Sequence, residues 1–115
     1  MKYLLTIQSQ ESFYGTISEA EMGEIMAGYE KFGTELAEAG AAIAGERLQP
    51  IATATTVRVR DGELNTTDGP FAETKEQIGG YYLINVDNLD DAIKWAAKIP
   101  TAKYGSVEVR PVWEM

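Results

Sequence analysis

The 115-residue sequence contains no cysteine and no histidine. The absence of cysteine excludes disulfides, thiolate nucleophiles and cysteine-ligated zinc or iron–sulfur sites. The absence of histidine excludes Ser-His-Asp chemistry and the usual haem and zinc ligand sets. We therefore expect neither a metal site nor another cofactor.

Basic residues are scarce, with 10 Lys and Arg against 18 Asp and Glu, which gives a net charge of -8. Proteins that bind nucleic acid or anionic membranes attract phosphate groups through Lys and Arg. We therefore expect no nucleic-acid partner and no membrane partner.

Long apolar runs are also missing, since no stretch approaches the roughly 18 apolar residues of a membrane span. The apolar run near the N-terminus is short and is followed by the polar residues 8–11, unlike a signal peptide. We therefore predict a cytoplasmic protein. Its 44% hydrophobic and 24% charged residues are typical of a globular chain, so residues 1–115 are predicted to form one domain.

The clearest predicted element is an amphipathic helix that begins after Ser18 and ends at Gly40. Glu21 stands three residues after Ser18, which is the spacing of a capping box, and glycine is a common helix stop. The other predicted elements are strands at 2–9, 53–60, 63–67, 81–86 and 106–112, a short strand within 41–50, a helical turn within 72–78 and a helix at 89–99.

The order of these elements predicts an α+β protein with a ferredoxin-like βαββαβ fold. The turn signal Asp61-Gly62 adds a hairpin in the middle of the chain. Right-handed crossovers would put both helices on one face of the sheet. Because several strands carry apolar groups on both sides, we expect the other face to meet the sheet of a second subunit in a homodimer.

The least ordinary local segment is Asp68-Gly69-Pro70-Phe71. Proline disfavours the helical conformation in the residue before it, so we expect Gly69 in a conformation open only to glycine, or a cis Gly-Pro bond. Asp68 then has two readings. It caps the turn by accepting bonds from nearby backbone N–H groups, or it lines a cleft as a catalytic general base or as an anchor for a ligand hydroxyl.

Arg58 and Arg60 share one strand face and could grip a carboxylate or phosphate. The alternative is that these arginines pair with acidic residues on neighbouring strands. Tyr81 either lines a cleft or packs in a core or dimer interface. The complete set of predicted ligand-binding residues is Ser9, Arg58, Arg60, Thr67, Asp68, Tyr81 and Arg110.

The chain resembles the YCII-related family, in the branch named after its Asp-Gly-Pro-Phe motif. The resemblance runs nearly end to end. It is carried by Met-Lys-Tyr-Leu-Leu at 1–5, Gly-Glu-Arg-Leu-Gln-Pro at 45–50, Ala-Thr-Ala-Thr-Thr-Val-Arg at 52–58, the run from Thr67 to Tyr82, and Val-Glu-Val-Arg-Pro-Val at 107–112.

This resemblance implies a ferredoxin-like fold that dimerises into an α+β barrel, with a cleft between the sheets and Asp68 as a site residue. Members outside this branch pair the aspartate with a histidine, a dyad that this chain cannot form. Members of the branch are often encoded beside extracytoplasmic-function sigma factors, which implies a sigma factor as a further partner.

Three hypotheses follow. The protein binds a small molecule in a cleft near Asp68, in a sigma-factor-linked regulatory context. Alternatively, it is an enzyme that acts on a small, hydroxylated aromatic substrate, with Asp68 as acid or base helped by Arg58, Arg60 or a tyrosine hydroxyl. In the third hypothesis it is a dimeric interaction module.

Overall fold

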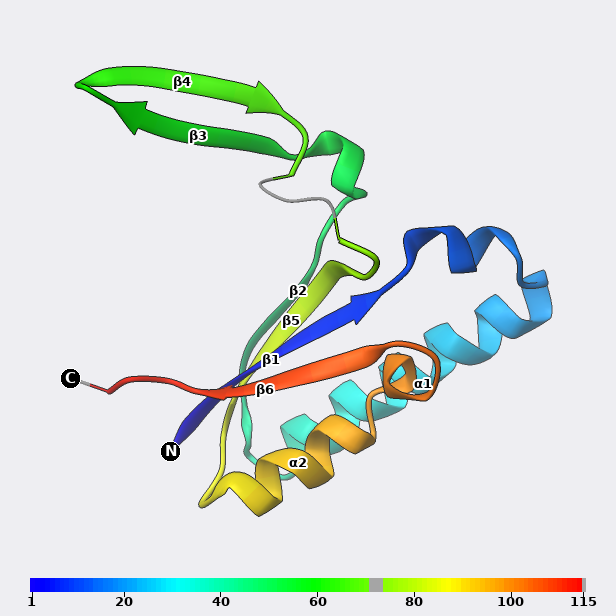
Figure 1. Cartoon of the computed structure of the whole chain (residues 1–115). Helices are drawn as coiled ribbons and strands as arrows, with labels where there is room; N and C mark the ends of the chain where they lie inside the picture. The colour runs from blue at the N-terminus through cyan, green and yellow to red at the C-terminus, as the bar shows by residue number, and fades with distance from the viewer. Residues whose placement is uncertain (71–73, 115) are drawn as a thin grey trace.

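The computed structural model describes residues 1–70 and 74–114 (Figure 1). Two α-helices and six strands, with three short 3-10 helices (η), make up this part of the chain. In chain order they are β1 (Lys2–Ser9), η1 (Glu11–Gly15), α1 (Glu19–Glu38), β2 (Ala42–Arg47), η2 (Ile51–Thr53), β3 (Thr55–Arg60), β4 (Glu63–Asp68), β5 (Gln77–Asn85), α2 (Leu89–Ala97), η3 (Pro100–Lys103) and β6 (Ser106–Pro111).

Four strands form one antiparallel sheet in the order β2-β5-β1-β6. With the inserted hairpin left out, this is the order second, third, first and fourth strand of a βαββαβ unit. The predicted ferredoxin-like α+β fold is therefore confirmed. Strands β3 and β4 form a separate two-stranded sheet inserted between β2 and β5.

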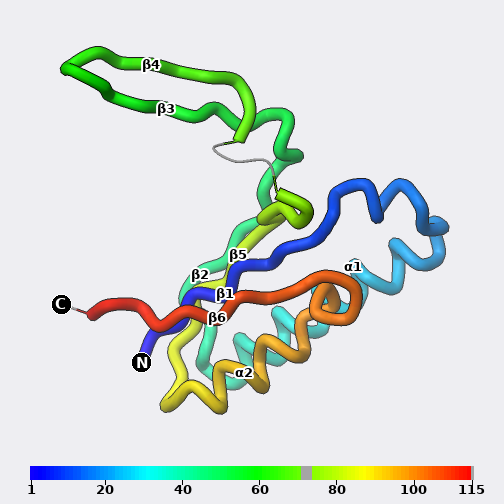
Figure 2. Tube along the Cα trace, in the orientation of Figure 1, coloured from blue at the N-terminus to red at the C-terminus, as the bar shows by residue number. Residues whose placement is uncertain are grey.

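Both α-helices cover the same face of the four-stranded sheet (Figure 2). Alternate residues of β1 point to that face, so Tyr3, Leu5 and Ile7 are buried. They belong to one core cluster with Phe32 and Leu36 of α1. The opposite face carries no helix, and below it is called the open face.

The β3–β4 hairpin extends from one end of the sheet on the side opposite the helices (Figure 1). The radius of gyration is consequently large, at 16.1 Å, whereas a compact chain of this length has about 13 Å. The turn has the predicted conformation, since Asp61 and Gly62 both have positive φ values, 53° and 77°.

Local signals at the ends of α1 are confirmed. The Ser18 Oγ accepts a hydrogen bond of 3.1 Å from the backbone N–H of Glu21, and Gly40 follows the helix with a φ of 71°. The glycine-specific alternative for Gly69 is also confirmed, because its φ is 101° and no peptide bond in the described ranges is cis.

Several boundary predictions were wrong. Gln77 and Ile78 do not continue a helical turn but begin β5, while residues 72–73 of the predicted turn lie outside the described ranges. Strand β5 therefore begins before the predicted strand at 81–86 and runs through Gly79 and Gly80. A Cβ at Gly80 would lie 2.9 Å from the carbonyl oxygen of Glu46, so glycine here allows β2 to approach closely. The second helix ends at Ala97 instead of residue 99.

No helix within residues 1–70 and 74–114 is both long and apolar enough to span a bilayer.

Candidate functional site

The root of the hairpin is tied together by Gly69. Its backbone N–H donates to the carbonyl of Ala54 at 2.7 Å, and its own carbonyl accepts from the Thr56 hydroxyl at 2.9 Å. The positive φ of Gly69 would strain any other residue. Local sequence therefore holds Asp68 and Pro70 at the point where the hairpin joins the body. Phe71, the last residue of the motif, lies outside the described residues.

A cavity of about 1000 Å³ lies between the hairpin root and the adjoining end of the main sheet. This volume is at the upper end of what small-molecule sites need. The cavity wall combines apolar side chains with several glutamines. It is lined by Gln8, Gln10, Leu48, Gln49, Pro50, Ile51, Thr53, Ala54, Pro70, Thr74, Lys75, Glu76, Gln77 and Ile78.

Glu11 and Gln77 connect the segments around this cavity. The Glu11 Oε2 accepts from the backbone N–H of Ile51 at 2.8 Å, and the Glu11 N–H donates to the Gln77 Oε1 at 3.1 Å. The Gln77 Nε2 donates to the carbonyl of Thr74 at 2.6 Å. These side chains were not among the predicted site residues. No local pattern identifies the bonds of Glu11, because they join it to Ile51 and Gln77, 40 and 66 residues away.

The hairpin separates the predicted residues into two groups. Cross-strand partners share a face, and the pairs Thr56–Thr67, Arg58–Asn65 and Arg60–Glu63 put Arg58, Arg60 and Thr67 together on one face. Asp68 pairs with Thr55 and therefore lies on the other face. It is exposed and does not line the cavity.

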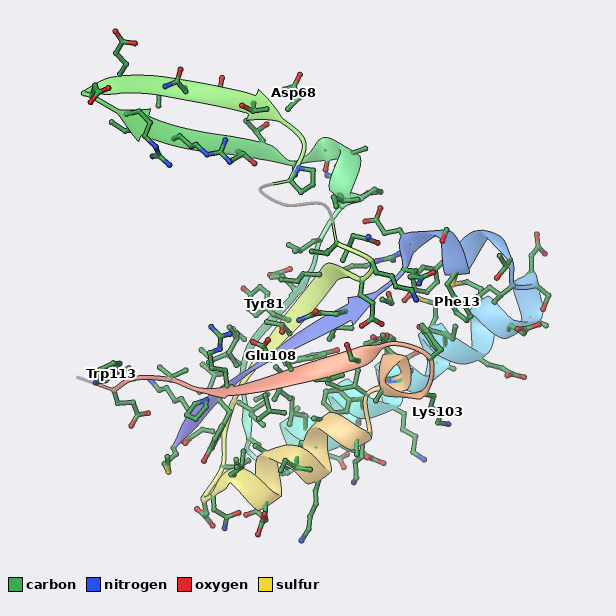
Figure 3. The ribbon with its side chains drawn as sticks, in the orientation of Figure 1. Phe13, Asp68, Tyr81, Lys103, Glu108 and Trp113 are labelled. Atoms are coloured by element: carbon green, nitrogen blue, oxygen red, sulfur yellow. The ribbon has the colours of Figure 1, made fainter. Side chains whose placement is uncertain are left out.

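Tyr81 and Arg110 lie on the open face of the main sheet. Thr6 on β1 stands opposite both Tyr81 on β5 and Glu108 on β6, and Figure 3 shows the last two side chains on the side away from the helices. The Arg110 Nη2 forms an exposed ion pair of 2.9 Å with the Glu108 Oε1. The alternative of arginine–acid pairing is therefore seen for Arg110, although with a residue of its own strand.

Ser9 lies in a third place, on the helix side of the sheet, where it is buried. Its Oγ is 3.4 Å from the Tyr14 hydroxyl. The Tyr14 hydroxyl lies 2.9 Å from that of Tyr104, which in turn lies 3.2 Å from the Thr101 Oγ1. Tyr29 closes this chain of hydroxyl groups with a short bond to Thr101. Ser9 thus belongs to a side-chain network on the opposite side of the sheet from Tyr81.

Burial raises the pKa of Tyr104 well above its usual value, and burial is also the main cause that raises the pKa of Tyr29. Both hydroxyls therefore stay protonated near neutral pH and can donate and accept at once. Phe13 stacks on the Tyr104 ring with 4.2 Å between ring centroids. The network joins η1, η3 and α1, which is a structural role.

In a single chain the predicted site residues thus occupy three separate places. Arg58, Arg60 and Thr67 lie together on the hairpin, with Asp68 on its other face. Tyr81 and Arg110 are on the open face, and Ser9 is in the hydroxyl network. Within residues 1–70 and 74–114, acidic side chains form no group of three or more that could hold a metal ion.

Comparisons with known proteins show the family to which the chain is similar. The family model described as YCII-related domain matches residues 1–115. The chain is also 38% identical over 114 residues to Uncharacterized protein R00369 of Rhizobium meliloti (strain 1021). That match covers 97% of this chain and 92% of the relative.

Proposed function

From the premise that this chain belongs to the YCII-related family, we propose that it is a small cytoplasmic protein that binds a small molecule in the cavity at the hairpin root. The observation that carries the proposal is the cavity itself, whose volume is about 1000 Å³. It adjoins Pro70 of the segment that the resemblance singles out. The proposal includes the homodimer expected from that resemblance.

The lining indicates the chemistry of the ligand. Leu48, Ile51 and Ile78 offer apolar surface, whereas glutamine side chains can donate and accept hydrogen bonds. Lys75 and Glu76 contribute one charge of each sign. A largely apolar molecule with uncharged polar groups fits such a wall, and a hydroxylated aromatic compound has this character.

Native mass spectrometry of the freshly purified protein tests whether a small molecule accompanies the chain. A titration with catechol, followed by isothermal calorimetry, then tests the predicted ligand class. Ile78→Lys would put a charge in the cavity wall, so we expect catechol to bind at least about 10-fold more weakly.

Ile93→Lys is the matched control, because Ile93 is on α2, outside the cavity lining, and has a similar exposed fraction, 48% against 51% for Ile78. It should leave catechol binding unchanged. The proposal fails if the protein carries no adduct and binds no catechol, or if both lysine variants bind catechol as the wild type does.

The enzyme alternative assigns Asp68 as a lone acid or base. Asp68 is exposed and lies across the hairpin from the Arg58 face, so one chain does not assemble the aspartate–arginine pair that would assist it. Turnover that is lost in Asp68→Asn while the fold is retained would favour this alternative. A stable complex with a sigma factor that survives Asp68→Ala would favour the interaction module.

A further inference from the structure

A second cavity lies at the other end of the main sheet, where β5 ends and α2 begins. Its volume is about 410 Å³, which is within the range of small-molecule sites. Figure 1 shows β5 running from the hairpin side of the molecule towards the start of α2. Ile78 lines the cavity at the hairpin root and Asn85 lines this second one, and the strand between them spans about 23 Å. The two cavities are therefore separate.

One face of α2 forms a wall of the second cavity. Side chains at positions i, i+3, i+4 and i+7 share one face of a helix, and the four that line the cavity in this way are Asp91, Lys94, Trp95 and Lys98. The helix dipole accounts for an acid near the N-terminal end and lysines near the C-terminal end. The dipole acts alike all round the helix, so it does not account for their gathering on the cavity side.

The charged groups of this cavity are only partly paired within the chain. The Lys98 Nζ lies 3.5 Å from the Glu35 Oε2. Asp87, in the turn before α2, adds a second carboxylate to the lining. Among residues 1–70 and 74–114, Asp87, Asp91 and Lys94 have no ion-pair partner. Asp91 and Lys94 are about 4.5 Å apart along the helix axis, so unpaired charges of both signs stand close together.

The rest of the wall includes apolar groups around Trp95. The Trp95 ring stands edge-on to Phe32, with 6.0 Å between the ring centroids and an interplanar angle of 82°. The Lys98 Nζ lies 4.9 Å from the Trp95 ring centroid, so the ring is held by two neighbours. Ala39 and Ala41, between α1 and β2, also line the cavity. Their small side chains leave space for an apolar group beside the indole ring.

We propose that this cavity binds a free α-amino acid with an apolar side chain. Asp87 and Asp91 hold its ammonium group, and Lys94 holds its carboxylate. Its side chain packs beside Trp95. An α-amino acid carries both charges on one carbon atom, which matches unpaired charges of both signs within one helical turn. A simple anion would meet two carboxylates here, and a simple amine would leave Lys94 unpaired. The site does not depend on the ligand proposed for the hairpin root.

Isothermal calorimetry with L-phenylalanine and L-leucine is the direct test. At least one of them should bind saturably. Two analogues of phenylalanine each lack one charge: 3-phenylpropanoate has no ammonium group and phenethylamine has no carboxylate. Each should bind at least about 10-fold more weakly than L-phenylalanine, because each loses charge-assisted hydrogen bonds. The proposal is refuted if neither amino acid binds, or if both analogues bind as well as L-phenylalanine does.

Neighbouring residues of α2 provide matched variants. Asp91→Asn and Asp90→Asn remove the same charge from the first turn of the helix, but only Asp91 lines the cavity. Asp91→Asn should weaken amino-acid binding at least about 10-fold, whereas Asp90→Asn should leave it unchanged. Lys94→Gln should weaken it as well, with Lys103→Gln, on η3 and outside the lining, as its control. Equal affinities in a variant and its control would contradict the assigned contacts.

Filling the cavity tests its location. Ala39→Leu places a larger side chain in the lining, whereas Ala37→Leu changes α1 outside it. Only Ala39→Leu should abolish amino-acid binding, and it should leave catechol binding at the hairpin root unchanged. If Ile78→Lys abolishes amino-acid binding and Ala39→Leu does not, the amino acid binds at the hairpin root and the second site is refuted.

Discussion

Val59 and Leu64 stand directly opposite each other on the two hairpin strands, and each has more than half of its side chain exposed. Such a cross-strand pair contributes roughly 0.2–1 kcal/mol. This is too little to order a protruding two-stranded hairpin by itself. Four predictions on stability follow, the first of which tests the proposed homodimer.

The first prediction concerns protein concentration. Because unfolding of a dimer releases two chains, raising the concentration from about 1 µM to about 100 µM should raise the Tm of the wild type by about 5 °C. Scanning calorimetry measures the Tm, and a concentration-independent Tm in the wild type would contradict the proposed homodimer.

The second prediction concerns glycines at which an added Cβ would, or would not, meet neighbouring atoms. A Cβ at Gly105 would lie 2.3 Å from the backbone carbonyl oxygen of Gln8. Neither backbone can move freely, so Gly105→Ala should lower the free energy of unfolding by about 2–3 kcal/mol. Urea unfolding is the measurement.

Gly23→Ala is the control for this prediction. Gly23 lies inside α1, and a Cβ there would meet nothing within 4 Å, so this change should stabilise the protein by up to about 1 kcal/mol. At Gly28, in the same helix, a Cβ would come 2.9 Å from the Pro100 Cγ. Gly28→Ala should therefore stabilise the protein less than Gly23→Ala does. Equal changes in the free energy of unfolding for the three variants would mean that the close contacts of the added Cβ do not determine stability.

The third prediction concerns the hydroxyl network. Tyr104→Phe removes the hydroxyl that lies between Tyr14 and Thr101 and leaves both without that partner. We expect a loss of about 1–2 kcal/mol in the free energy of unfolding. Tyr81→Phe, on the open face, should have a smaller effect on stability. If the two variants are equally stable, the network does not contribute as described.

The fourth prediction concerns alkaline pH. Burial raises the pKa of Tyr104 and Tyr29 in the folded protein, whereas an unfolded tyrosine titrates near pH 10. The unfolded state therefore loses its protons first. Stability should be fully present below about pH 10 and should fall as the pH rises from there towards the folded-state pKa values.

Tyrosinate absorbance in the near ultraviolet, recorded together with circular dichroism, would follow this alkaline transition. In the wild type, part of the tyrosinate signal should appear only as the protein unfolds. Tyr104→Phe should reduce that delayed part. Complete tyrosine titration of a folded protein at about pH 10 would contradict the predicted direction.

Much of the fold could be predicted because its signals are local. The Ser18 cap, the positive-φ turn at Asp61 and Gly62 and the strand–helix order all appear in the structure as expected. The start of β5 was misplaced for a physical reason, since the strand includes Gly79 and Gly80. A glycine that ends an element and one that admits a neighbouring strand look alike until the neighbour is known, as at Gly80 beside Glu46.

The candidate site was less predictable. Grouping Arg58 with Asp68 overlooked a signal that the two-residue turn provides, since that turn sets a register in which Asp68 pairs with Thr55. The role of Glu11 has no such signal. Its bond to Ile51 joins segments 40 residues apart, and only the packed sheet brings these segments together.

The sequence by itself determined most of the secondary structure, the ferredoxin-like topology and the special conformation of Gly69, because short-range sterics and hydrophobic periodicity govern these features. Tertiary structure alone decided which polar groups meet. It placed Ser9 in a buried hydroxyl network, left Val59 and Leu64 uncovered, and opened a cavity at the hairpin root. These outcomes depend on how elements distant in sequence pack, and no local pattern specifies that packing.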